Sequence, residues 1–460
     1  MNEVTEDTPS LRSENYALDA QMLERILDAL EDESHEGLAE LLEPLHAADI
    51  ADLLEQISPG NRRALLALWP AGIDGDVLSE LDEGLREEVI EYLPPEVLAE
   101  AVRELDSDDV VDLVEDLEPE QQGAILGALD EADRVAVEQA LTYPEYTAGR
   151  LMQRELVMAP EHWSVGEVID HMRATEDLPE QFYHVMLVDP RMHVVGKVAL
   201  GRIMASPREM PLRQIAEEDF RTIPVTQSQE DVAYAFNQYH LISAPVVNEA
   251  GRLVGVITID DAMAVLSEEA EEDILRLAGV GEESLSDRVL EIARGRFGWL
   301  LVNLVTAIIA SLVIAQFEAT IAQIVALAVL MPIVASMGGN AGTQSLTVAV
   351  RALATRDISA SNLWRVVRRE AVVGLINGVG FAVIMGVVAM LWFGEPMLGL
   401  VIGLAMVCTM VAAGVGGIVV PLLLERARVD PALASGPFVT TITDVVGFFA
   451  FLGLAAVILL

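Results

Sequence analysis

Basic residues are scarce in this chain of 460 residues, and lysine is nearly absent: Lys197 is the only lysine, beside 27 arginines. With 73 acidic residues, the formal net charge is −45. Nucleic acid is bound through its phosphates by Lys and Arg, so a surface of this sign excludes nucleic acid as a partner. Such a surface concentrates cations instead.

Cysteine is also nearly missing. Cys408 is the only one and lies in an apolar run, which excludes a disulfide framework and a cysteine-based metal site. The seven histidines lie outside the apolar runs and lack the spacing of metal ligands. Residues 1–13 are polar, so we expect no cleavable signal peptide, and we predict a disordered tail at 1–17.

The negative charge is confined to one part of the chain. Residues 291–460 contain 8 acidic and 9 basic residues, whereas residues 1–290 contain 65 acidic and 19 basic residues, a net charge of −46. Two interpretations stay open: the acids sense divalent cations, or they adapt the surface to a salty cytosol.

An apolar residue recurs every twelve positions between residues 45 and 141. The series is Leu45, Ile57, Trp69, Leu81, Leu93, Leu105, Leu117, Leu129 and Leu141. Helix-start residues such as Pro94, Pro95 and Glu96 follow the apolar positions. One short helix per repeat cannot bury its apolar face alone, so the pattern predicts an all-α superhelical domain at 18–142, with an interaction or regulatory role.

Residues 143–268 contain two copies of a helix, strand, turn and strand pattern. This order resembles a tandem pair of cystathionine-β-synthase (CBS) domains, an α/β module that senses small ligands. In the second copy Thr258 and Asp261 match the nucleotide-binding positions of that family. The first copy has Ala199 and Arg202 at those positions, so ATP is left open as a ligand.

Five apolar runs of nearly membrane-spanning length follow a connecting segment at 269–297. They cover residues 299–317, 321–337, 371–393, 397–424 and 437–460. Arginines cluster before the first run, between the second and third, and between the fourth and fifth. The positive-inside rule makes these loops cytoplasmic. We therefore expect a multi-pass plasma-membrane protein with its N-terminal half inside and its C-terminus outside.

Asp444 is an acidic residue within the last apolar run, about 10 Å from its cytosolic start. A carboxylate at that depth costs on the order of 3 kcal/mol, and such residues face a partner or a water-filled path. No apolar run supplies an Arg or Lys as partner. Two such carboxylates around a two-fold axis, with the hydroxyl of Thr441 or a neighbouring Thr, would suit Mg²⁺, which prefers hard oxygen ligands.

Pro332 in the second apolar run and the pair Gly338-Gly339 directly after that run predict a broken helix at membrane depth. Freed carbonyls and the amides of Asn340 and Gln344 would then offer neutral oxygen ligands. Alternatively, the small residues let helices approach closely. The same packing role is expected of Gly374 and Gly378.

The motif from Pro332 to Gln344, the Asp430-Pro431-Ala432 segment and the motif ending at Asp444 resemble the MgtE family of magnesium channels. The order of helical domain, CBS pair, connecting helix and five spans resembles it too. The resemblance implies a homodimer with a pore on its axis, Asp444 as ion-selecting carboxylate, Asn340 near it and Asp430 near the cytosolic mouth. It also implies that a connecting (plug) helix closes the pore when Mg²⁺ bridges acidic side chains. The candidate regulatory ligands are Asp260, Asp261, Glu269, Glu272 and Asp273.

The predicted architecture is thus multi-domain: an all-α superhelical domain at 18–142, an α/β CBS pair at 143–268, a plug helix at 269–297 and a five-helix membrane domain at 298–460. The predicted function is Mg²⁺-gated Mg²⁺ transport without enzymatic activity. Two alternatives are a transporter of Mn²⁺ or Co²⁺ and a membrane-anchored sensor that transports nothing.

Overall fold

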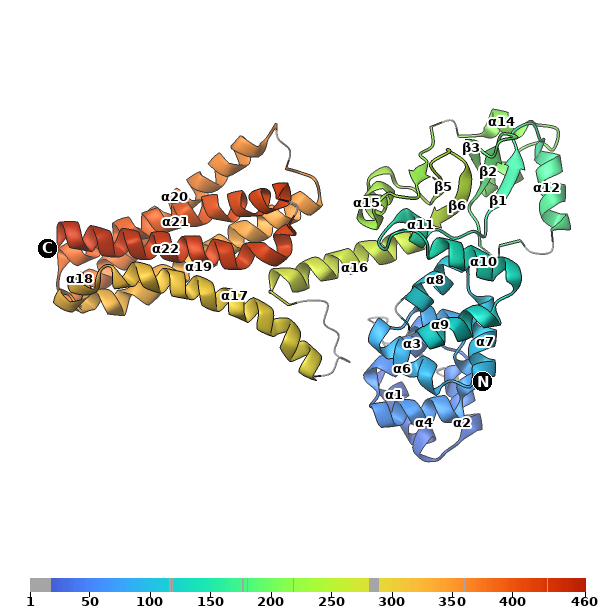
Figure 1. Cartoon of the computed structure of the whole chain (residues 1–460), viewed down its shortest axis with the longest axis horizontal. Coiled ribbons are helices and arrows are strands. Elements are labelled where there is room, and N and C mark those ends of the chain that lie inside the picture. The colour runs from blue at the N-terminus through green and yellow to red at the C-terminus, as the bar shows by residue number, and fades with distance from the viewer. Residues whose placement is uncertain are drawn as a thin grey trace, which may run out of the picture. The chain divides into compact units, whose positions relative to one another are not determined.

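The chain divides into two units in the computed structural model, an N-terminal unit of residues 1–267 and a C-terminal unit of residues 268–460 (Figure 1). The structure describes residues 18–115, 117, 119–175, 178–179, 181–217, 219–280, 289–358, 361–427 and 429–460. The predicted disordered tail lies outside the described residues.

Short helices form the first part of the N-terminal unit, and they follow the predicted repeat. The elements are α1 (Ala20–Glu31), α2 (His35–Leu42), α3 (Ala47–Gln56), α4 (Pro59–Leu68), η1 (Pro70–Gly72), α5 (Gly75–Ser79), α6 (Glu83–Tyr92), α7 (Pro95–Glu104), α8 (Ser107–Glu115), α9 (Pro119–Ala128) and α10 (Glu131–Ala140). From α3 to α10 the helices begin twelve residues apart, except in the α5 repeat, where the 3₁₀ turn η1 comes first. Proline at the first helical position, as in α4, α7 and α9, favours these starts.

The apolar series lines one continuous core of this helical region. Its members Ile57, Trp69, Leu81, Leu93 and Leu117 are no more than 7% exposed. Two buried arginines continue the periodicity: Arg62 Nη1 lies 2.6 Å from Glu88 Oε2, and Arg86 Nη1 lies 2.7 Å from Asp112 Oδ2. In the second ion pair, both the arginine and the carboxylate lie two twelve-residue repeats after their counterparts in the first. The first pair therefore links α4 to α6, and the second links α6 to α8.

Two small sheets follow and confirm the two predicted copies. The first has the order β1 (Val157–Pro160), β2 (His184–Val188), β3 (Val194–Ala199), and the second has β4 (Ile223–Pro224), β5 (Ser243–Val247), β6 (Leu253–Thr258). In each, the first pair is parallel and the second is antiparallel with an irregularity at its end. The accompanying helices are α11 (Ala148–Leu151), α12 (Val165–Ala174), α13 (Leu200–Ala205), α14 (Leu212–Ile215) and α15 (Gln229–Tyr239).

Helix α16 (Ile259–Leu277) starts directly after β6 and contains the acidic run of residues 260–273. It ends before Gly279, whose φ of +73° is a conformation that glycine adopts without strain. The region predicted as a connecting helix therefore comprises the end of α16 and the first turns of the next helix, while residues 281–288 lie outside the described residues.

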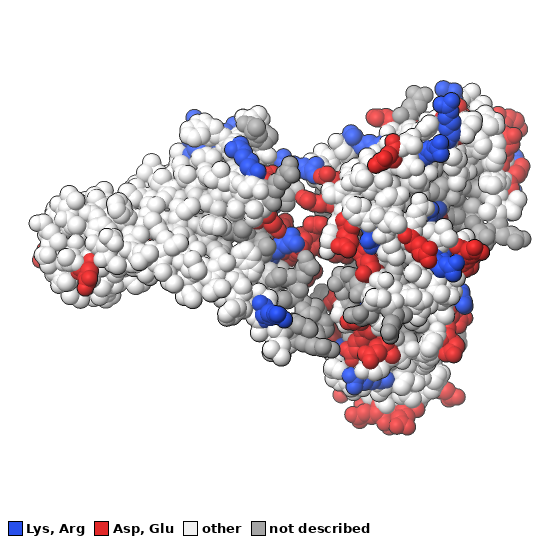
Figure 2. Space-filling view, viewed as in Figure 1, with Lys and Arg blue, Asp and Glu red and all other residues white. Residues whose placement is uncertain are grey.

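In the described residues after α16, the C-terminal unit contains six helices. They are α17 (Val289–Ala315), α18 (Glu318–Gln323), α19 (Ala326–Ala354), α20 (Leu363–Phe393), α21 (Pro396–Arg426) and α22 (Pro431–Ile458). All but α18 are long and apolar enough to cross a membrane, which confirms the five predicted spans. Helix α21 packs against α19, α20 and α22, whereas α17 and α20 expose apolar side chains along their length. In Figure 2, charged side chains of this unit lie towards its ends.

The predicted break in the second span is wrong, because α19 runs continuously through Pro332, Gly338 and Gly339. The alternative interpretation, close packing, fits the structure. A Cβ on Gly338 would lie 2.5 Å from Thr409 Cγ2, and a Cβ on Gly342 would lie 2.7 Å from Val439 Cγ1. These glycines therefore let α21 and α22 approach α19, and they leave its backbone helical.

Gly374 and Gly380 offer a matched test of this packing on α20. A Cβ on Gly374 would lie 2.5 Å from the backbone carbonyl oxygen of Met410, whereas nothing lies within 4 Å of a Cβ on Gly380. We expect Gly374→Ala to destabilise the protein by about 1–3 kcal/mol, since α21 must move. Gly380→Ala should melt like the wild type in detergent. Equal melting temperatures for the two variants would contradict the close contact.

Candidate functional site

A polar stripe runs along one side of the otherwise apolar helix α19. Its members are Ser336, Asn340, Thr343, Gln344 and Thr347, all exposed and spaced three or four residues apart or adjacent. That spacing puts them on a single helix face. Exposed polar side chains at membrane depth require water or a protein partner. The stripe therefore marks a surface that does not face lipid.

Asp444 of α22 lies at the level of this stripe. The preceding residue, Thr443, is fully buried, and its Cβ would lie 3.3 Å from a Cβ on Gly338. Gly338 and Gly342 both face α22 and flank Asn340 in sequence, so α22 meets α19 beside Asn340. Asp444 itself is partly exposed, and no hydrogen bond or ion pair within the described part of the chain engages its carboxylate. The structure thus brings Asn340 and Asp444 to the same level of two packed helices.

The threonines near Asp444 differ in their surroundings. Thr441 is partly exposed and donates its hydroxyl to the carbonyl of Pro437 at 2.6 Å. Its oxygen keeps lone pairs for a cation or a water molecule. Thr443 donates to the carbonyl of Thr440 at 2.9 Å and is buried between helices, so it supports packing.

Asp430 and Glu272 share an arginine. Asp430 caps α22, where its Oδ1 accepts a hydrogen bond from Ala432 N, and its Oδ2 lies 2.8 Å from Arg276 Nη1. Arg276, in the last turn of α16, is also ion-paired with Glu272. Asp430 precedes Asp444 by 14 residues, about 21 Å along a helix. The two aspartates therefore belong to different sites.

At the start of α16, the two predicted nucleotide-binding residues, Thr258 and Asp261, are hydrogen-bonded to each other. The Thr258 hydroxyl donates to Asp261 Oδ2 at 2.6 Å and contacts Asp260 as well. The backbone N–H of Thr258 also donates to Asp261 Oδ2. Further along α16, Glu269 and Asp273 each interact with neighbouring groups. Asp261 thus acts here as a cap at the first turn of the helix.

An acidic cluster that the sequence analysis missed surrounds Asp261 in the N-terminal unit. Its other members are Asp106, Asp108, Asp109, Glu155 and Asp260. Burial, followed by repulsion from neighbouring carboxylates, raises the pKa of Asp106 to about 6 and that of Asp109 to about 7. Burial raises the pKa of Asp261 too. This much negative charge in partly dry surroundings favours protons or cations.

Asp108 gives the clearest sign of a missing partner. It is 9% exposed, burial raises its pKa well above the usual range, and its Oδ1 accepts no hydrogen bond from any residue that the structure describes. Within the described ranges, no three His, Cys, Asp or Glu side chains converge as ligands of one metal ion. The carboxylates are therefore close enough to repel each other, but they do not converge on a common metal position. The sequence signal was the run Asp106-Ser107-Asp108-Asp109, which holds more acids than a helix start requires.

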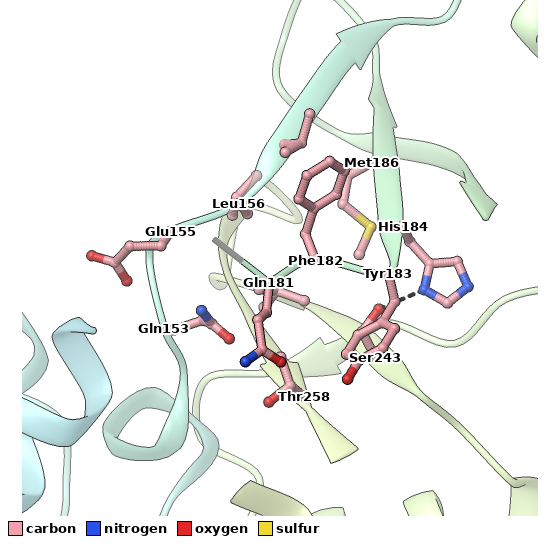
Figure 3. A pocket seen from close by; sticks show the side chains of 12 residues that line it. Gln153, Glu155, Leu156, Gln181, Phe182, Tyr183, His184, Met186, Ser243 and Thr258 are labelled. Carbon is pink, nitrogen blue, oxygen red and sulfur yellow. Dashed lines mark hydrogen bonds between the residues drawn. The ribbon is translucent and has the colours of Figure 1, made fainter. Parts of the chain in front are cut away.

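A small pocket lies between the two sheets (Figure 3). Its walls include Gln153, Gln181, Phe182, Tyr183, His184, Ser243 and Thr258. His184 Nδ1 lies 2.8 Å from Ser243 Oγ, and the only lysine, Lys197, donates to the Ser243 carbonyl. Burial and the nearby Lys197 lower the pKa of His184 to about 4, so the ring is neutral at pH 7. The pocket wall thus combines aromatic rings with neutral polar groups and one carboxylate, that of Glu155.

The chain combines five apolar helices, a large acidic unit and a polar stripe that is exposed midway along α19. These features define the class of polytopic membrane transport proteins. Family comparisons give the same result. Residues 331–454 match the MgtE divalent cation transporter family, residues 45–146 the MgtE intracellular N domain and residues 212–268 the CBS domain.

The chain is 34% identical to the magnesium transporter MgtE of Thermus thermophilus over 71% of this chain and 73% of that protein. It is 32% identical to the Enterococcus faecalis MgtE over 70% of this chain and 71% of that protein. Among solved structures, it is similar to the cytosolic domain of the Mg²⁺ channel MgtE in complex with ATP, at 30% identity and a TM-score of 0.49 over 53% of this chain and 99% of that one. The chain belongs to the MgtE family of magnesium transporters.

Family membership confirms several predictions. The protein is a non-enzymatic, multi-pass divalent cation transporter of the magnesium transporter family with an intracellular N domain. The alternative of a membrane-anchored sensor without transport is thereby set aside. The CBS match covers the second copy, which contains Thr258 and Asp261.

The raised pKa values predict a pH-dependent stability. Between the unfolded value near 3.8 and the folded values of about 6 and 7, folded Asp106 and Asp109 hold protons that the unfolded chain has released. The free energy of unfolding should therefore fall as the pH rises from about 4 to about 7. Because Asp106 is exposed, solvent screens its contribution, and the expected fall is on the order of 1–3 kcal/mol. Thermal melts of residues 1–267 measure this slope.

The double variant Asp106→Asn, Asp109→Asn should flatten that slope. Glu36 and Glu40 are exposed on α2, and their change to Gln removes the same charge without touching the cluster. This control should keep the wild-type slope. An unchanged slope in the aspartate variant would rule out its carboxyls as the source.

Proposed function

We propose that the chain conducts Mg²⁺ as a homodimer, through a pore that α19 and α22 of both copies line. The observation that carries the proposal is the partly exposed Asp444 carboxylate, which lies beside the polar stripe of α19 and has no hydrogen-bond or ion-pair partner among the described residues. In a single chain this surface would face lipid at a high cost in free energy. Apposition of two copies removes the stripe from lipid and brings two carboxylates to one axis.

The donor set suits a hydrated Mg²⁺ ion as the transported substrate. Mg²⁺ loses its water reluctantly and is held by few carboxylates with waters in place. Asp444 from each copy would supply the charge, while Asn340 and Thr441 would hold waters through neutral oxygens. Softer divalent ions such as Mn²⁺ and Co²⁺ also accept oxygen ligands. We assign Mg²⁺ as the preferred ion and these ions as competitors.

The proposed orientation follows from the arginines. Arg351, Arg356, Arg365, Arg368 and Arg369 all lie close to the loop between α19 and α20. This loop would face the cytosol, on the side of the intracellular N domain. Five spans would then put the C-terminus outside the plasma membrane.

The first test is removal of the pore charge. We expect Asp444→Ala to abolish Mg²⁺ flux into liposomes, and Asp444→Asn, which keeps the shape, to reduce it at least tenfold, because no formal charge remains on the axis. The matched control is Glu395→Gln, a change at an exposed carboxylate beside the N-terminus of α21. Wild-type flux through purified, dimeric Asp444→Ala would remove Asp444 from the pathway.

We further propose that cytosolic Mg²⁺ closes the channel by binding to the acidic cluster. Asp106, Asp108 and Asp109 would bind it together with Asp260 and Asp261. The Asp108 oxygen that has no hydrogen bond within the described ranges supports a cation there. Mg²⁺ would replace the protons that the raised pKa values favour. A ligand shifts a conformational equilibrium only through its preference for one state, and relief of carboxylate repulsion would supply that preference.

Helix α16 would carry this signal towards the pore. Asp261 is in its first turn, and Arg276, in its last turn, binds the N-cap of the pore helix α22. Glu269, Glu272 and Asp273 lie between them and remain proposed Mg²⁺ ligands. Glu272 and Asp430 are bound by Arg276 in this structure, so an ion there would compete with the arginine.

The gating test uses the charge-matched pair of double variants. Wild-type flux should fall as cytosolic Mg²⁺ reaches millimolar levels, and Asp106→Asn, Asp109→Asn channels should stay open. Glu36→Gln, Glu40→Gln channels should close normally. Mg²⁺ should also stabilise residues 1–267 by about 2.7 kcal/mol at a hundredfold excess over its Kd. If KCl of equal ionic strength reproduces both effects, general screening accounts for the acidity.

The pocket favours a nucleoside as a second ligand. Phe182 and Tyr183 offer faces for a base, and Thr258 and the two glutamines offer hydrogen bonds. No Lys or Arg is among the described wall residues, the ring of His184 is neutral at pH 7, and Glu155 adds a negative charge. Binding of ATP through its phosphates is therefore less favoured than binding of the nucleoside part.

A further inference from the structure

Glu370 is the one buried charged side chain among the described residues of the C-terminal unit. It lies in α20 and is 7% exposed. A buried carboxylate costs free energy unless hydrogen bonds and a counter-charge replace its water. Its partners therefore indicate why the position is acidic.

The two carboxylate oxygens have different partners. Ser345 Oγ, on α19, donates to Oε2 at 3.2 Å. Arg369 Nη2 lies 3.3 Å from Oε1, and the arginine side chain is 67% exposed. Thus Oε2 accepts a hydrogen bond from the buried Ser345 between the helices, and the charge at Oε1 is balanced by the exposed Arg369.

Helix α21 brings these two groups together. A Cβ on Gly414 would lie 2.7 Å from the Glu370 carbonyl oxygen, and a Cβ on Gly417 would lie 2.7 Å from Ser345 Cβ. Both α19 and α20 therefore rest directly on α21. Helices α19 and α20 make few direct contacts with each other. The bond between Ser345 and Glu370 is a direct polar link between them.

Ser345 is adjacent to Gln344 and five residues after Asn340, but it is buried whereas these two are exposed. A rotation of α19 about its axis would move Ser345 away from Glu370 and turn the polar stripe by the same angle. Binding constellations must be held within about 10–20° of their working geometry. A link on the buried side can therefore fix the exposed side.

We propose that Glu370 is a positioning residue, which fixes the rotation of α19 through Ser345 and so aims the polar stripe of Asn340 and Gln344 at the ion path. The proposal rests on the proposed pore. Glu370 does not touch the ion. Its effect is on how well the pathway distinguishes ions, because selectivity depends on where the neutral oxygens lie.

The experiment compares Glu370→Gln, Glu370→Leu and Ser345→Ala in reconstituted full-length protein, with Mg²⁺, Mn²⁺ and Ca²⁺ flux measured over a concentration range. Glu370→Leu and Ser345→Ala should each lower the ratio of Mg²⁺ to Ca²⁺ flux by about threefold to tenfold. Glu370→Gln keeps an oxygen that accepts from Ser345, so its selectivity should stay within about twofold of wild type.

Ser311→Ala is the matched control for Ser345→Ala. Ser311, on α17, donates to the Ala307 carbonyl of its own helix and is exposed. Its loss should leave selectivity unchanged. Ser345→Ala removes one hydroxyl and keeps the test decisive if Glu370→Leu does not fold.

The combined variant Ser345→Ala, Glu370→Leu should be no worse than the more affected single variant, because both remove the same link. Wild-type selectivity in folded Ser345→Ala, or effects that multiply in the combined variant, would overturn the proposal. Failure of the pore itself would appear separately, as wild-type flux through Asp444→Asn.

Discussion

Removal of water from a carboxylate costs free energy unless a donor, a basic group or a cation takes its place. This constraint separates the acidic residues of the chain into distinct roles. Glu370 is buried and satisfied by Ser345 and Arg369, so it behaves as a structural group. Asp444 is partly exposed and lacks a partner among the described residues, so it can accept an ion. The same chemical group is thus a structural link in one span and the proposed ion ligand in another.

The same distinction separates the two interpretations of the acidic N-terminal unit. Adaptation to a salty cytosol requires carboxylates that face water, and many exposed acids of the short helices meet that requirement. It gives no reason to bury Asp108 beside Asp106 and Asp109, where burial, and after it these neighbouring carboxylates, raise the pKa of Asp108. Buried repulsion lowers stability, so it is a cost that a bound cation can reverse. Under the proposed gating by Mg²⁺, the two interpretations therefore apply to different residues.

Sequence patterns predicted the architecture well because its signals are local and repeated. The twelve-residue series gave the helix starts, the two strand pairs gave the sheets, and uninterrupted apolar length gave the spans. The wrong expectation was the break in α19. Gly338 was interpreted through backbone freedom, whereas its role depends on Thr409, 71 residues away, which the sequence does not place nearby.

The acidic cluster and Glu370 could not be predicted for a related reason. Asp106 and Asp261 are 155 residues apart, and only folding of the N-terminal unit brings the start of α8 to the start of α16. Glu370 follows Arg368 and Arg369 at the edge of an apolar run, where the positive-inside rule explains charge without any contact. Its burial comes from Gly414 and Gly417 on α21, which bring α19 and α20 close enough for Ser345 to reach it. Helix packing through glycine therefore determines which charged residues lose their water, and loss of water determines which of them need a partner.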